Sequence, residues 1–96
     1  METYVLVEKS GESDPKFLAV FKNKGKAWVM YFNILEDYLK TNGVAYEVAD
    51  LPVPNAREAI QKIYEEYSES LPENERYKLS VRCYKNRGGD DWWFAL

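Results

Sequence analysis

The residues that usually carry out enzymatic chemistry are scarce in this chain. Its 96 residues include no histidine and a single cysteine, Cys83. The missing histidine argues against His-based general acid–base catalysis, Ser-His or Cys-His nucleophile pairs and most zinc and iron sites. The lone cysteine excludes an internal disulfide framework, which suits a reducing compartment. We therefore predict a protein that is not an enzyme and that holds no metal and no cofactor.

Basic residues surround a glycine where a strand is expected to give way to a helix. The residues are Lys22, Lys24, Gly25 and Lys26. Backbone N–H groups at a helix start and lysine side chains can both bind a phosphate, so these four residues form a candidate anion site. The pattern is not a Walker A motif, which requires its own glycine spacing and a following Ser or Thr. The alternative is a loop whose lysines extend into water.

A second basic stretch runs from Arg76 to Arg87 without an acidic residue. Strand alternation places Lys78, Arg82 and Tyr84 on one face of it. Such a face could hold a phosphate backbone while tyrosine stacks on bases. It could equally contact a protein, or be a solvated face that discourages strand-on-strand aggregation.

Acidic residues are concentrated between positions 58 and 75. Six glutamates stand there against one basic residue, Lys62, so the net charge of -3 hides strong segregation of charge. Glu65 and Glu69 align on one face of an expected helix. This face could dock on a basic protein surface, or it could be an ordinary exposed helix face with charge pairs four residues apart.

Aromatic residues make up 16% of the chain and include a run at Trp92-Trp93-Phe94. Adjacent strand residues face opposite ways, so Trp93 points away from the side that Trp92 and Phe94 share. One of these sides is exposed or covered by a partner, unless the sheet is covered on both faces. Because Trp and Tyr are enriched at interface hot spots, Trp93 is a candidate anchor for a homodimer or a target protein. The alternative is packing within the monomer.

The hydrophobic pattern predicts the elements that must position these residues. Strands are predicted over Thr3–Glu8, Lys16–Lys22, Val44–Asp50, Arg76–Lys85 and Trp92–Leu96. A helix is predicted over Gly25–Lys40, with Asn23 near its start and Gly43 just past its end. Residues 26–32 could instead form a strand after a turn, but the helical periodicity continues through Leu39 and favours the helix.

The second predicted helix starts with a capping signal. Asn55 can cap it, and Glu58 follows three residues later as in a capping box. The resulting order is ββαβαββ. We predict one α+β domain over residues 1–96, a mostly antiparallel sheet of about five strands with two helices on one face.

Location and function are predicted by elimination. The chain shows no signal-peptide pattern and no apolar run near the roughly 20 residues that span a bilayer, so we expect a small soluble cytoplasmic protein with no membrane partner. We expect it to bind a protein without catalysis, as a small inhibitor, an immunity factor or a phage-type modulator of a host or of its defences. The partner-binding residues would be Trp93, Tyr84, Arg82, Lys78, Glu65 and Glu69. The alternative is a module for nucleic acid or a phosphorylated ligand, which would use the lysines of the candidate anion site and the basic C-terminal hairpin.

Overall fold

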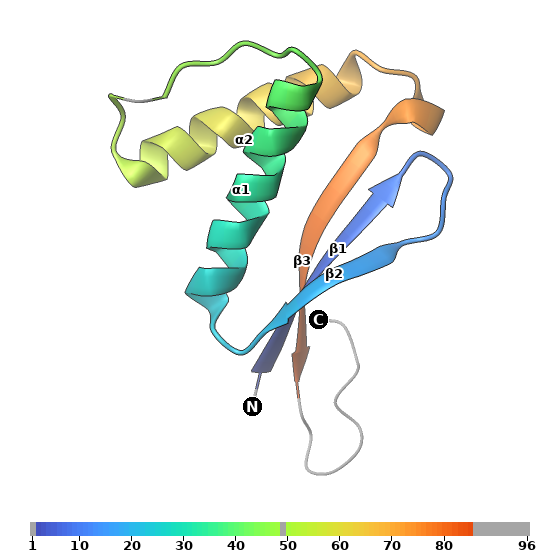
Figure 1. Ribbon diagram of the computed structural model, residues 1–96, viewed down its shortest axis with the longest axis vertical. Helices are drawn as coiled ribbons and strands as arrows, with labels where there is room; N and C mark the ends of the chain where they lie inside the picture. The colour runs from blue at the N-terminus through green and yellow to red at the C-terminus, as the bar shows by residue number, and fades with distance from the viewer. Residues whose placement is uncertain (1, 49, 86–96) are drawn as a thin grey trace.

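The computed structural model describes residues 2–48 and 50–85 (Figure 1). The elements are β1 (Glu2–Ser10), β2 (Lys16–Phe21), α1 (Lys24–Thr41), α2 (Val53–Glu69), a short 3-10 helix η1 (Glu73–Glu75) and β3 (Tyr77–Lys85). Three antiparallel strands and two helices form a small α+β domain, as predicted.

The strand order is β2-β1-β3, so the first strand in the sequence is the central one. β1 and β2 form a hairpin, and β3 returns along the other edge of β1 from Glu2↔Lys85 to Ser10↔Tyr77. Gly11 begins the hairpin connection with a φ of 57°, and its N–H donates to the Arg76 carbonyl at 2.8 Å. A Cβ atom at Gly11 would lie 2.1 Å from the Asn74 carbonyl oxygen, so this close approach requires glycine.

The helix predicted after β2 is confirmed, and the alternative strand over residues 26–32 is wrong. Asn23 caps α1: its side chain accepts a hydrogen bond from the Lys26 N–H at 3.1 Å. Beyond the helix, Gly43 adopts a φ of 71°, the left-handed conformation that commonly ends helices. The buried stripe recurs every four residues, at Ala27, Tyr31, Leu35 and Leu39.

α2 begins earlier than predicted, and the proposed cap at Asn55 is wrong. Pro52 is the N-cap residue, and no side chain caps this helix. Asn55 therefore lies inside the first turn of α2. The helix can begin before Pro54 because the N–H groups of a first turn have no acceptor within the helix, so a proline there costs no hydrogen bond.

The strand predicted over Val44–Asp50 is also wrong, because residues 44–48 form no strand. The alternation of Val44, Tyr46 and Val48 is real, but these side chains pack against the hydrophobic core rather than marking a sheet. The Tyr46 hydroxyl donates to the Glu36 carboxylate on α1 at 3.1 Å, which ties the segment to that helix. The strand predicted over Trp92–Leu96 lies outside the described residues, so in the described part the sheet has three strands instead of five.

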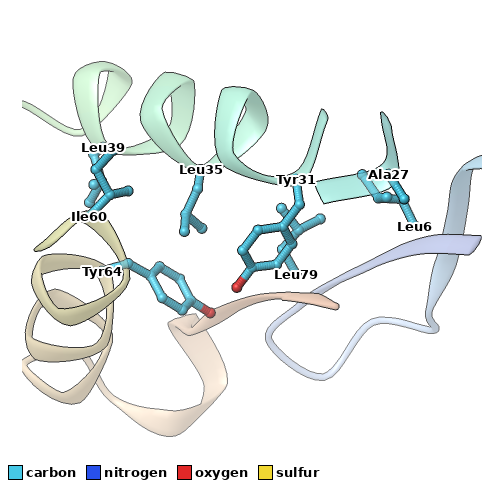
Figure 2. Packing of buried hydrophobic residues seen from close by; sticks show 8 residues of the cluster. All are labelled: Leu6, Ala27, Tyr31, Leu35, Leu39, Ile60, Tyr64 and Leu79. Carbon is cyan, nitrogen blue, oxygen red and sulfur yellow. The ribbon is translucent and has the colours of Figure 1, made fainter. Parts of the chain in front are cut away.

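Both helices lie on the same side of the sheet (Figure 1). Leu6 of β1 and Leu79 of β3 join side chains of both helices in one buried cluster (Figure 2). Tyr64 of α2 points toward β3, where its hydroxyl donates to the Tyr77 carbonyl. The core therefore sits between the helices and one face of the sheet.

Candidate protein-binding site: the open face of the sheet

The strand register assigns the strand residues to two faces of the sheet. Leu6 pairs with Ala19 and Val81 and belongs to the face that the helices cover. Its neighbour Val5 pairs with Val20 and Arg82 on the opposite face, because paired residues in antiparallel strands share a side. We call this second side the open face, since neither described helix covers it. Its strand residues are Thr3, Val5, Val7, Lys9, Phe17, Val20, Lys78, Ser80, Arg82 and Tyr84.

A β-bulge brings Phe17 and Val20 to the open face together. The pairing passes from Leu6↔Ala19 to Val7↔Phe17, so Leu18 is an extra residue in β2. Without the bulge, alternation would place Phe17 with Ala19 on the covered face. Phe17 and Val20 are both 64% exposed. Sequence reasoning missed this pair, because no glycine or other residue type marks the bulge.

The open face has an apolar half and a basic half. One row across the strands is Val20–Val5–Arg82, and the next is Phe17–Val7–Ser80. Val5 and Val7 of β1 are buried, so the exposed apolar side chains of this face are those of β2. Adjacent strands lie about 4.8 Å apart, so the apolar side chains of β1 adjoin the basic ones of β3, and those of β2 lie two strands, about 10 Å, from them.

The covered side of the sheet carries strand residues of both signs, since Lys16 pairs with Glu8 there, whereas the charged strand residues of the open face are all basic. The acidic strand residues Glu2 and Glu8 both fall on the covered side, where the Glu8 carboxylate accepts a hydrogen bond from the Tyr77 hydroxyl at 2.7 Å. The strand residues of the open face include Lys9, Lys78 and Arg82 and no Asp or Glu. The open face is therefore cationic in a chain whose net charge is -3.

The structure brings together three of the predicted partner-binding residues. Lys78, Arg82 and Tyr84 share the open face, as strand alternation predicted. Glu65 and Glu69 are exposed on α2, in the helix layer on the other side of the sheet. One flat interface therefore cannot include both groups. Trp93 lies outside the described residues, and its role stays a prediction.

The four residues of the candidate anion site lie at the end of β2 and the start of α1, and all are exposed. The Lys26 N–H already donates to the Asn23 side chain. A Cβ atom at Gly25 would lie 3.2 Å from that same Asn23 oxygen, so the glycine leaves room for the helix cap. Capping thus accounts for Gly25, and anion binding by the lysines stays a prediction.

Among the described residues, the titratable groups with shifted pKa values are tyrosines, and Tyr31, Tyr64 and Tyr77 lie between the helices and the sheet. Burial raises the pKa of Tyr64 to about 12, and it also raises the pKa of Tyr31, whose hydroxyl donates to the Gln61 side chain at 2.7 Å. Burial and the bond to Glu8 raise the pKa of Tyr77 well above its usual value. These hydroxyls are therefore neutral hydrogen-bond donors at physiological pH, and they serve the packing of the helices on the sheet.

A second apolar surface lies where α2 begins. The exposed side chains there are Val29, Leu51 and Val53. They border a pocket of about 210 Å³ between the helices. Arg57 and Glu36 also line this pocket, so its border carries both signs of charge, whereas the open face carries one.

Three further findings bear on the class of site. Within residues 2–48 and 50–85, no group of three or more Cys, Asp or Glu side chains is placed to hold a metal ion. Neither α1 nor α2 is long and apolar enough to cross a bilayer. No family model, curated protein or solved structure matches the chain.

Proposed function

We propose that this is a non-catalytic binding protein that acts on another protein through the open face of its sheet. The observation that carries the proposal is the exposure of Phe17 and Val20 on the same face as the basic side chains of β3, with the central strand β1 between them. Apolar surface removed from water contributes about 25 cal/mol per Å². An apolar patch bordered by polar residues is typical of a protein-binding site.

The residue types on the basic half also suit a protein interface. Arg and Tyr are enriched at interface cores and hot spots, and Arg82 and Tyr84 follow one another on this side of β3. Trp93 would extend the same interface, as the sequence predicts. A small inhibitor, an immunity factor or a phage-type modulator acts by covering a surface of its target, and such a role requires no catalytic group.

The acidic face of α2 would act at longer range. Glu65 and Glu69 lie in the helix layer, and the basic residues of the open face lie beyond the sheet. This separation gives the molecule an electrostatic polarity that orients an approaching partner. We propose that Glu65 and Glu69 influence the rate of association without touching the partner.

Photo-crosslinking tests the proposed surface. A benzoylphenylalanine residue replaces Val20 in one protein and Val53 in another, since both valines are 64% exposed but only Val20 lies on the open face. In the cells that naturally make the protein, we expect position 20 to give a discrete cross-linked product that position 53 does not give.

A matched pair of variants completes the test. For this pair, benzoylphenylalanine replaces Phe17, which is also 64% exposed on the open face. Val20→Thr should weaken recovery of the partner cross-linked from position 17, whereas Val53→Thr should leave it unchanged. The open face is not the binding site if positions 20 and 53 give equal amounts of cross-linked product. The same conclusion follows if Val20→Thr leaves the amount of cross-linked partner unchanged.

Binding of a nucleic acid or a phosphorylated ligand is the second candidate function. Two observations favour it: Tyr84 lies on the same face as Lys78 and Arg82, and the lysines around Gly25 are exposed. This function predicts affinity that falls steeply with salt. Tryptophan fluorescence can monitor a titration with single-stranded oligonucleotides or nucleotides at low salt. The absence of any fluorescence change would exclude this second function.

A further inference from the structure

We infer that the partner of the open face presents an acidic amphipathic segment, which lays apolar side chains on Phe17 and Val20 and a carboxylate on Arg82. This inference rests on the proposed function and specifies the chemistry of the partner.

Arg82 is the centre of the argument because of its neighbours. It pairs with Val5, and Ser80 and Tyr84 precede and follow it on the same side of β3. None of these neighbours carries a negative charge. Among the described residues, Glu8 borders the same depression as Arg82, but it belongs to the covered side of β1. A carboxylate brought to the open face would meet a guanidinium flanked there by uncharged side chains, and guanidinium–carboxylate contacts are among the strong hydrogen bonds of proteins.

Lys78 plays a lesser part. It pairs directly with Lys9, and two like charges facing each other across strands are unfavourable. Glu12 and Glu73, however, border the same depression as both lysines and offset part of this charge. We therefore expect Arg82 to contribute more than Lys78 to the recognition of a partner carboxylate.

The spacing on the face suits an amphipathic helix. Lys78 and Arg82 are four residues apart on one strand, which corresponds to roughly 13 Å. Carboxylates seven or eight residues apart on a helix are separated by about 10–12 Å, and long basic side chains can reach the remaining distance. The apolar column on β2 is two strands away, about 10 Å, which is near the width of one helix. A single helix can therefore cover both halves.

Two other occupants fit the face less well. Two copies of this chain meeting face to face would bring the basic half of each onto either the basic half or the apolar half of the other, and neither arrangement pairs a charge with its opposite. A single-stranded nucleic acid needs rings on which successive bases stack. Phe17 and Tyr84 supply rings, but the row between them is Val20–Val5–Arg82, which supplies none.

The test compares two helix-forming peptides of 18 residues. Both carry a leucine stripe, flanked by glutamates in one peptide and by glutamines in the other. Binding to the full chain is measured by fluorescence anisotropy of the labelled peptide in 0.15 M salt. We expect the glutamate peptide to bind at least tenfold more tightly than the glutamine peptide.

Matched variants assign the effect to the face. Arg82→Gln should weaken the glutamate peptide at least about fivefold and leave the glutamine peptide unchanged. Lys40→Gln removes the same charge from an exposed position on α1 and should change neither affinity more than twofold. Val20→Thr should weaken both peptides equally.

The outcomes separate this inference from the proposed function. Equal affinity for the two peptides, or binding of neither, overturns the acidic partner, while the proposed function stands if position 20 still cross-links a protein. Loss of the cross-link from position 20 overturns the proposed function itself. Tighter binding of an oligothymidine of 18 nucleotides than of the glutamate peptide overturns both in favour of the nucleic-acid function.

Discussion

The two sides of the sheet are made from alternate residues of the same three strands, yet they have different tasks. On the covered side, Leu6 and Leu79 are buried against the helices, and Tyr64 and Tyr77 use their hydroxyls within the protein. On the open side, Phe17 and Val20 are mostly exposed, and the strand charges have one sign. Under the proposed function, stability and recognition would therefore depend on neighbouring residues of one strand. They should respond to mutation independently.

The largest effect should come from the covered side. Leu35→Ala removes a side chain that is 0% exposed at the centre of the core, and such truncations cost about 2–5 kcal/mol. Urea unfolding followed by circular dichroism measures this loss. Val29→Ala on the exposed side of the same helix is the control and should change stability by less than about 0.5 kcal/mol. Similar losses for both variants would contradict the assignment of the core.

The tyrosines of the covered side should make stability sensitive to alkaline pH. An unfolded tyrosine ionises near pH 10, whereas Tyr64 keeps its proton up to a pKa of about 12. Between these values the unfolded chain binds fewer protons, so the free energy of unfolding falls as pH rises. Tyr64→Phe should cost about 1 kcal/mol at pH 7 through the lost hydrogen bond and should make this fall shallower. Urea titrations from pH 9 to 12 measure both, and identical slopes for the two proteins would contradict the role of Tyr64.

The helix that covers the sheet should depend on its cap. Asn23→Ala removes the acceptor of the Lys26 N–H and should cost about 1 kcal/mol. Asn23→Asp keeps an acceptor and adds a negative charge at the helix start, so it should preserve stability or increase it slightly. Thermal unfolding compares the three proteins. An Asp variant as unstable as the Ala variant would show that the cap is not what positions α1.

The smallest effect should come from the open side. Val20→Thr keeps the shape and strand preference of the residue, and it should change stability by less than about 0.5 kcal/mol because Val20 is mostly exposed. Urea unfolding measures this value. A loss above about 1 kcal/mol would mean that Val20 is buried in solution, and the contrast between the two faces would then disappear.

Much of the fold was predictable because periodic patterns have few structural solutions. Ala27, Tyr31, Leu35 and Leu39 line one side of a helix together with the adjacent Trp28 and Phe32, whereas a strand would place Trp28 and Phe32 on its other face. The pattern over Val44–Asp50 was misleading for a physical reason. Alternation requires only that every second side chain find an apolar surface, and here the helices supply that surface in place of a sheet.

The candidate site was predictable on one strand only. Alternation along β3 correctly placed Lys78, Arg82 and Tyr84 together, since that strand pairs with β1 without interruption. The apolar half depends on the β-bulge at Leu18, and no residue type in the local sequence predicts that bulge. The start of α2 was missed because a helix can begin without a side-chain cap, so the suitable residue Asn55 was given a role that Pro52 fills.

The position of β1 at the centre of the sheet has a consequence for how the chain folds. β1 can pair with β2 as soon as the short hairpin connection is made. Its other edge stays unpaired until β3, at the far end of the described chain, is available. Such non-local pairing slows folding, because a long loop must close before its contacts form. During synthesis, β1 therefore keeps one edge unpaired until the residues of β3 have also left the ribosome. In that interval the hairpin is the part of the nascent protein most exposed to aggregation.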